Sequence, residues 1–228
     1  MKNFVGANVR KEYLPHHRLG DKQHGGDEYN KKSMFLQLSS KLLDIGNKAR
    51  TQGKKYTTKI SLRLSGIFSK LDKKVFSKQE YREGSWYGND TIWRTIVDIN
   101  RIVKYADKSG KMQNMPQRNI FNIADMIIIG EKEGPLLPTP KYGGVITMGE
   151  NIVCFDEIIA SLLGMDINKI PLYKNVRAKR KWPIENDKDY GEIVSNKKEW
   201  NKKSVKEITR DIAINIEPTS GWKGNIEL

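Results

Sequence analysis

The segment of residues 121–165 constrains the fold more than any other part of the sequence. It contains two short apolar runs, residues 126–129 and 145–148, which are rich in β-branched side chains and bounded by glycine. Such runs favour strands that are covered on both faces, and a sheet of covered strands needs helices on each side. The sequence therefore predicts an α/β fold with a mixed central sheet flanked by helices.

Length and composition predict one globular domain. The chain has 228 residues, and its hydrophobic content of 37% can fill a core. It has no apolar run long enough to cross a membrane and no signal-peptide pattern, which predicts a cytoplasmic protein. Cys154 is the only cysteine, which excludes a disulfide within the chain and a cysteine-ligated iron–sulfur cluster. We predict a single α/β domain over residues 1–228.

The positive charge is concentrated in residues 47–83, which we predict to be a basic helical insertion. They hold eleven Lys and Arg against three acids, more than half of the net charge of +14. Apolar residues within them recur at the three- and four-residue spacing of an amphipathic helix: Ile60, Leu64, Ile67, Phe68, Leu71 and Val75. Three interpretations stay open: a packed helix with a basic solvent face, docking on an anionic membrane surface or a partner protein, and nucleic-acid binding. The sequence has no motif of a nucleic-acid module.

Further helices are predicted by apolar periodicity and capping residues. One begins at Ser33 and ends at Gly46, and a second begins near Thr91, where Asn89 and Asp90 are candidate N-caps. A third covers residues 151–163 and is closed by Gly164. Residues 204–210 predict a short helix, and the alternation of residues 212–216 predicts an edge strand.

A polar loop near the N-terminus is the first candidate site. It contains His16, His17, Arg18, His24 and Asp27 within a few residues of one another. Imidazole and carboxylate groups are ligands for divalent metals, which makes His17, His24 and Asp27 a candidate metal set. The same loop, through His16, His17 and Arg18, is a candidate for contact with phosphate or sugar. The alternative is an ordinary polar loop whose histidines bind backbone carbonyls.

The start of the helix near Thr91 is the second candidate site. Its free amides favour an anion, Trp86 offers a ring for stacking, and Arg94 offers a bidentate grip on phosphate. Asn89 and Asp90 would complete this ligand-binding set. The alternative is that the two polar residues only cap the helix and the aromatic residue fills a seam.

The third candidate site consists of carboxylates near strand ends and a helix start: Asp125, Glu131, Glu133 and Asp156. Glu131 and Glu133 follow the first apolar run, where open α/β sheets keep their ligands. Together with Asp27 they are candidate catalytic acid and base groups or magnesium ligands. The alternative is that both glutamates are solvated.

At the level of longer motifs, the stretch ADMIIIGEKEGPLLPTPKYGGVITMGENIVCFDEIIASLLGMDINKIP resembles the C-terminal half of the domain-of-unknown-function 362 (DUF362) family. The pieces NFVGANVRKEYLPHHRLGDKQHGGDEY, EGSWYGNDTIWRTIVDINRIVKYADKSGK and EPTSGWKGNIE resemble a branch of that family found beside bacterial surface-polysaccharide genes. The resemblance implies a strand, an acidic glycine- and proline-containing loop, a second strand and a helix. It also implies an N-terminal half that this chain lacks, and it implies no established activity.

Site residues and resemblance together predict an enzyme or enzyme fragment. Its substrate would be a small anionic molecule, phosphorylated or sugar-linked, of surface-polysaccharide metabolism, and a divalent metal is a candidate cofactor. The reaction class is not readable from the sequence. The first alternative is a noncatalytic adaptor that docks on an anionic membrane surface or a partner through the basic helix, and the second is nonspecific nucleic-acid binding.

Overall fold

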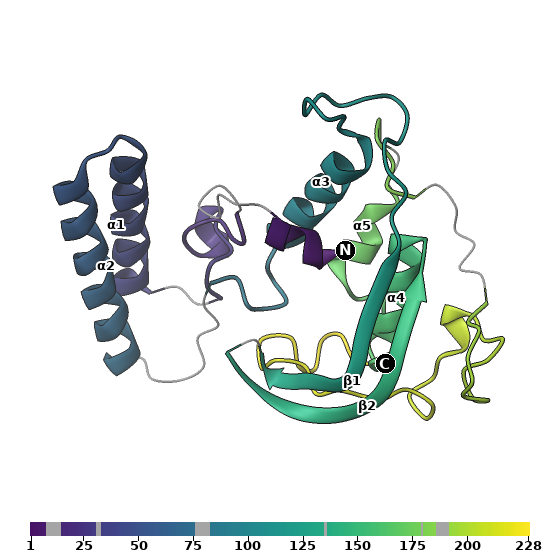
Figure 1. The fold of residues 1–228 in the computed structure, drawn as a ribbon. Coiled ribbons are helices and arrows are strands. Elements are labelled where there is room, and N and C mark those ends of the chain that lie inside the picture. The colour runs from purple at the N-terminus through teal and green to yellow at the C-terminus, as the bar shows by residue number, and fades with distance from the viewer. Residues whose placement is uncertain (8–14, 31–32, 76–82, 135, 179, 186–191) are drawn as a thin grey trace. The chain divides into compact units, whose positions relative to one another are not determined.

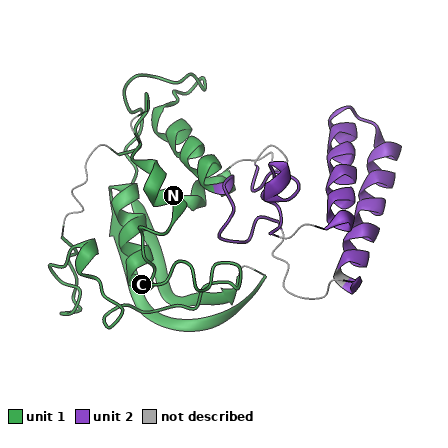
Figure 2. Cartoon of the chain, turned by 180° about the vertical axis from the view of Figure 1, so that it is seen from behind, with its two compact units in different colours: residues 1–14, 93–228 green, residues 15–92 purple. Residues whose placement is uncertain are grey.

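The computed structural model describes residues 1–228 except 8–14, 31–32, 76–82, 135, 179 and 186–191. The chain divides into two compact units, which Figure 2 shows in different colours. Unit 1 contains Met1–Leu14 and Trp93–Leu228, and unit 2 contains Pro15–Ile92. Each unit is described by itself.

Unit 1 contains a two-stranded antiparallel sheet, in which β1 (Asn122–Glu133) pairs with β2 (Leu137–Gly149) (Figure 1). Met126 lies opposite Val145, and a bulge follows Met126. The side of the sheet that carries Met126 is the inner face, whereas Ile123 and Ile146 are exposed on the outer face. The fold therefore combines helices with a small sheet. Within the described residues, the two-stranded sheet does not confirm the prediction of a central sheet flanked by helices.

Polar caps begin two further helices as predicted. The Oδ1 atom of Asn89 accepts from the backbone N–H of Ile92 at 2.9 Å, where α3 (Ile92–Tyr105) begins. The side chain of Asn151 caps α4 (Ile152–Leu162), and Gly164 follows that helix with a φ of +84°. A short helix, α5 (Pro171–Val176), was not predicted. Both capping predictions are confirmed.

The C-terminal part of unit 1 closes the core with loops. Leu162 of α4 packs with Trp200 and Ile208 in one buried cluster. Residues 212–216, predicted as an edge strand, form no regular strand, and the N–H of Ile214 instead donates to the carbonyl of Leu162 at 2.7 Å. The helix predicted at 204–210 is a single 3-10 turn, Val205–Glu207.

Unit 2 contains a hairpin of two antiparallel helices, α1 (Met34–Thr51) and α2 (Lys55–Val75) (Figure 1). Ser33 is the N-cap of α1, as its position predicted. The prediction that Gly46 ends this helix is wrong, because α1 continues to Thr51. A Cβ atom on Gly46 would lie 3.1 Å from Leu62 Cδ2, so the missing side chain allows α2 to approach closely.

The two helices of the hairpin meet through hydroxyl groups. Among the side chains of α2 that the structure describes, the buried ones are Ser61, Ser65 and Asp72. The hydroxyls of Ser39 and Ser65 are 2.9 Å apart, and the hydroxyl of Ser33 donates to the carboxylate of Asp72. Of the predicted apolar stripe of α2, Phe68 stacks on Phe35 of α1, whereas the other members stay exposed: Ile60, Leu64, Ile67, Leu71 and Val75. Across the described part of the chain, none of the helices has the length and apolar character that a membrane crossing requires.

Candidate functional site

Asp27 is the centre of a compact loop cluster in unit 2. Its carboxylate is only 1% exposed and accepts from the N–H of Arg18 at 2.5 Å and the N–H of Asp90 at 2.8 Å. The hydroxyl of Thr91 donates to it at 2.6 Å, and the guanidinium of Arg18 lies 3.7 Å away. Oδ1 therefore binds within residues 15–30, and Oδ2 joins that segment to residues 83–91. This is a structural role for a predicted catalytic residue.

The predicted ligand-binding residues of the second site lie around the same carboxylate. The indole N–H of Trp86 donates to the carbonyl of Asp27 at 3.0 Å, and the side-chain amide of Asn89 donates to the carbonyl of His16 at 2.9 Å. The fold thus brings the first two candidate sites together. Their polar atoms nevertheless bind one another. The exposed Arg18 is also engaged, because its Nε donates to the carbonyl of Gly25 at 2.9 Å, and the side chain of His16 is exposed beside it.

The predicted metal ligands are not gathered into one group. The Nδ1 atom of His24 lies 2.8 Å from Asp21 Oδ1, whereas His17 Nδ1 is buried and has no hydrogen-bond partner. Within the described ranges, no three His, Cys, Asp or Glu side chains are arranged to hold a metal ion. The metal set of His17, His24 and Asp27 stays a prediction that this geometry does not support.

Asp21 is the acid that the sequence reasoning missed in this loop. It is buried, and burial acts to raise its pKa, but hydrogen bonds from the ring and backbone of His24 outweigh that effect and lower the pKa below its usual value. The same carboxylate caps the 3-10 turn Lys22–His24. Its spacing from His24, three residues in a glycine-rich loop, is the signal that could have identified it.

The remaining predicted residues lie in unit 1, where they hold the chain in place. Glu131 accepts from the backbone N–H of Glu217 at 3.0 Å, and Glu133 accepts from that of Ser220 at 3.1 Å. The guanidinium of Arg94 lies 4.4 Å from the centre of the Trp93 ring. The three predicted catalytic acids are thus divided between two units, and the two glutamates fasten the C-terminal segment to β1.

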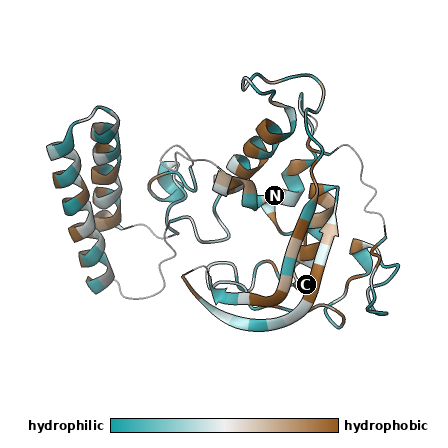
Figure 3. Ribbon diagram, viewed as in Figure 1, coloured by the Kyte–Doolittle hydropathy of each residue, from teal (hydrophilic) through white to brown (hydrophobic). Residues whose placement is uncertain are grey.

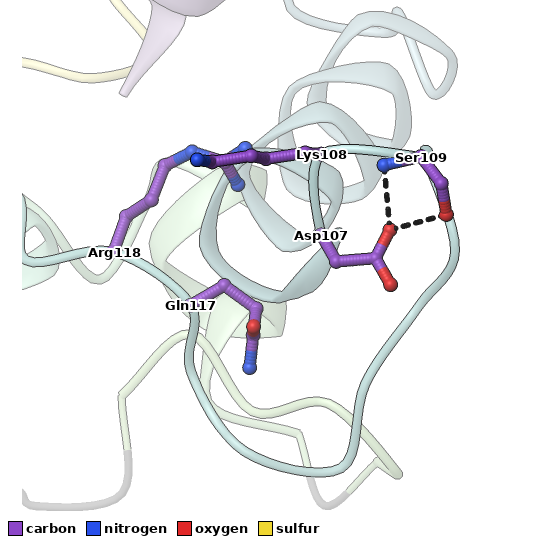
Figure 4. A pocket seen from close by; sticks show the side chains of 5 residues that line it. All are labelled: Asp107, Lys108, Ser109, Gln117 and Arg118. Atoms are coloured by element: carbon purple, nitrogen blue, oxygen red, sulfur yellow. Dashed lines mark hydrogen bonds between the residues drawn. The ribbon is translucent and has the colours of Figure 1, made fainter.

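A hollow of about 560 Å³ lies beside the turn that follows α3 (Figure 4). Asp107 accepts from the backbone N–H and the hydroxyl of Ser109, and the hydrogen bond from that hydroxyl lowers the Asp107 pKa. Arg118 donates to the carbonyls of Val103 and Ala106, the last of which is 2.5 Å away. The charged groups of this hollow therefore stabilise the turn and the helix end.

A buried ion pair joins α4 to the end of α5. Two nitrogens of Arg177 donate to the two carboxylate oxygens of Glu157, one of them at 2.8 Å, and Glu157 is 1% exposed. Burial raises the pKa of Glu157, and the guanidinium acts in the opposite direction. The sequence signal was a glutamate on the apolar side of a predicted helix, four residues after Val153.

The hairpin of unit 2 carries an apolar surface that we call the hairpin face. Its side chains come from both helices and are all exposed, Ile60 by 59% and Ile67 by 52%. The rings of Phe35 and Phe68 stack with centres 6.5 Å apart, one turn from Leu38 and Leu64 respectively. This ring pair joins the two helices, and Figure 3 shows apolar residues along both of them. The hairpin face consists of Met34, Leu38, Ile45, Ile60, Leu64, Ile67, Leu71 and Val75.

Comparisons with family models, with curated proteins and with solved structures find no match to this chain. The resemblance to the DUF362 family therefore stays a prediction.

Proposed function

We propose that the α1–α2 hairpin docks the protein on an anionic membrane surface. The observation that carries this proposal is the hairpin face, whose large apolar side chains remain exposed on both helices although the helices are packed against each other. An interfacial helix has this character, because its apolar side enters the headgroup boundary while its cations contact the headgroups.

The exposed stripe argues against the simplest alternative, a packed helix with a basic solvent face. That alternative requires the stripe of α2 to be its buried side. In the described part of unit 2, α2 instead buries Ser61, Ser65 and Asp72, and its isoleucines face outward. Contiguous exposed apolar surface of this kind marks an interaction site in a soluble protein.

Cations border the hairpin face on both outer edges. On α2, Arg63 and Lys70 lie three or four residues from Ile67, which makes them its neighbours on the helix surface. On α1, Lys41 and Lys48 each lie three residues beyond Leu38 and Ile45. Each lysine or arginine near an anionic bilayer contributes about 1 kcal/mol of attraction. An apolar centre with a cationic rim therefore matches lipid tails bordered by anionic headgroups.

The charge of the hairpin disfavours the other partners. Residues 34–75 contain ten Lys and Arg and two aspartates, a net charge of +8, and one of these aspartates, Asp72, is buried. A second copy seated on the hairpin face would bring two cationic rims together. A nucleic-acid duplex would meet the cations but leave the apolar centre without a partner, because the duplex presents a charged backbone.

Vesicle sedimentation of the whole chain tests the proposal. We expect binding to vesicles of phosphatidylcholine mixed with phosphatidylglycerol and much weaker binding to phosphatidylcholine alone. The variant with Arg63→Glu, Lys70→Glu and Lys74→Glu should lose at least about 100-fold in partitioning, since three attractions become repulsions. Ile60→Ser with Ile67→Ser should lose about 10-fold or more, because less apolar area enters the interface.

The matched control carries the same change of net charge elsewhere. Lys108→Glu, Lys111→Glu and Lys206→Glu replace exposed lysines of unit 1 and should change partitioning by less than about twofold at physiological salt. Equal losses in both triple variants would mean that binding reports only the overall charge, and the proposal would fail. Full binding by the double serine variant would also overturn it.

An enzyme that acts on a small anionic substrate has weaker support. The exposed His16 and Arg18 favour contact with an anion, but Asp27 is fully used within the loop cluster. Elemental analysis and native mass spectrometry of the purified chain test it: retained metal or a retained small anion would revive the hypothesis. A mixed central sheet flanked by helices likewise stays a proposal, supported by the exposed apolar outer face of β1 and β2.

A further inference from the structure

A groove of about 910 Å³ lies in unit 1 between β2, α4 and residues 192–197. One wall is the final part of β2, from Gly144 to Gly149, and the floor contains Cys154, Phe155 and Ile158 of α4. Trp200 and residues 192–197 form the remaining wall. This volume is in the range of about 300–1,000 Å³ that is usual for ligand pockets.

We propose that this groove receives an extended peptide segment, which adds to the free edge of β2 as a third strand. The proposal is independent of the hairpin and concerns a different unit. It assigns a class of partner: a peptide whose apolar side chains alternate with polar ones.

The backbone of β2 supplies the first argument. Among the described residues the sheet has two strands, so the edge of β2 opposite β1 has no strand partner. In an antiparallel pair, every second residue directs its N–H and C=O away from its neighbour, which creates a row of free donors and acceptors along that edge. Proteins protect free edges with lysine or proline. β2 carries Pro138, Pro140 and Lys141 in its first half, but residues 143–149 contain neither type.

The side chains that line the groove supply the second argument. Val145 and Thr147 lie on the inner face of the sheet, beside α4, and the Thr147 hydroxyl is buried without a hydrogen-bond partner. An added strand would place alternate side chains over the same apolar floor and could bring a polar side chain to Thr147. The free segment of five residues, 145–149, matches the usual strand length of about 5–6 residues.

The walls of the groove favour a single segment over a second folded copy. The edge strand of another sheet carries its own neighbouring strand on its far side. In this groove the far side is occupied by residues 192–197 and Trp200. A lone extended chain fits between the walls, whereas a partner copy of the β1–β2 sheet would have to displace one of them.

Selection from a phage-displayed library of random eight-residue peptides, with the whole chain as bait, tests the proposal. Enriched peptides should alternate apolar and polar residues. A synthetic copy of the strongest binder should slow hydrogen exchange by about 10-fold or more at those amides of residues 145–149 that point away from β1, because strand pairing protects them.

Two variants test whether a lysine weakens peptide binding only in the groove or at any position of β2. Thr147→Lys places a charge in the groove and should weaken peptide binding by about 10-fold or more, whereas Thr139→Lys, at an exposed position of the same strand, should leave it within about twofold. If the lysine at 147 prevents folding, Thr147→Val replaces it, and that variant should retain the exchange protection. Failure to enrich alternating peptides, or protection outside residues 145–149, would overturn the proposal. Amides already protected in a peptide-free dimer would show that a second copy covers the edge.

Discussion

Helices α2 and α3 both carry apolar residues at helical spacing, but α3 buries several of them, whereas most of those of α2 are exposed. In α3, Ile96 is 4% exposed and Val97 is equally buried, whereas in α2, Ile60 is 59% exposed. The difference lies in what each helix packs against. α3 buries large side chains, among them Trp93, Ile96 and Val97. α2 buries Ser61 and Ser65 instead, and of its predicted apolar stripe Phe68 stacks on α1. Periodicity therefore identifies the residues that share a side of a helix, but it does not tell whether another element covers that side.

The largest expected effect separates the two stripes directly. Val97→Asp should destabilise the protein by about 4 kcal/mol or more, because it buries an unpaired carboxylate. Ile67→Asp should change the free energy of unfolding by no more than about 0.5 kcal/mol, since the site is exposed. Urea unfolding followed by circular dichroism measures both. A comparable loss of unfolding free energy in the Ile67→Asp variant would mean that the hairpin face is covered in solution, and the contrast between α2 and α3 would then be wrong.

Charge pairs extend the comparison from apolar to polar groups. Arg177→Met leaves Glu157 buried without its partner and should cost about 3–5 kcal/mol. Lys48→Met removes an exposed pair with Asp44, 2.8 Å apart, and should cost at most about 0.5 kcal/mol.

The Arg177→Met deficit should also depend on pH. The pKa of Glu157 is already raised by burial and should rise further without the guanidinium. A carboxyl with a raised folded-state pKa contributes stability at low pH that is lost as the pH rises through that pKa. The deficit should therefore shrink on acidification, and unfolding measured at several pH values would reveal a deficit that stays constant instead.

Substitution of two glycines tests how closely α1 and α2 approach each other in the hairpin. Gly46→Val places methyl groups against Leu62 and should cost about 1–3 kcal/mol. Gly66→Ala, in the same hairpin, meets no atom within 4 Å and should stabilise the helix by about 0.5–1 kcal/mol. Thermal unfolding of both variants sharpens the comparison, because equal effects would mean that α1 and α2 do not approach closely at Gly46.

The smallest expected effect concerns the loop cluster. The pKa of Asp21 is lowered in the folded state from its ordinary value of 3.8. Its stabilising contribution is therefore fully present above that value and is lost as the pH falls through the lower folded-state pKa. Asp21→Asn should unfold at a lower urea concentration than the unchanged protein near neutral pH. The two midpoints should converge in acid, and a constant difference would contradict a charge-based role.

Local signals in the sequence predicted the helices and their caps well. Asn89, Asn151 and Gly164 mark the ends of α3 and α4 because capping depends on a few neighbouring residues. Gly46 was misinterpreted, since close packing and helix termination both select glycine. The sequence also predicted that His16, Trp86 and Asn89 belong to related sites. It could not reveal that Asp27 binds three donors, because those contacts depend on how the distant segments 15–30 and 83–91 meet.

The contact between α1 and α2 leaves the residues of the hairpin face free to change in sequence. α1 and α2 meet through Ser39 and Ser65 and through the close approach of Leu62 to Gly46, so the exposed leucines and isoleucines of the hairpin face lie outside that contact. Mutations can then retune affinity for an outside partner while the hairpin stays assembled. Binding to a partner and pairing of the two helices thus depend on different residues of α1 and α2.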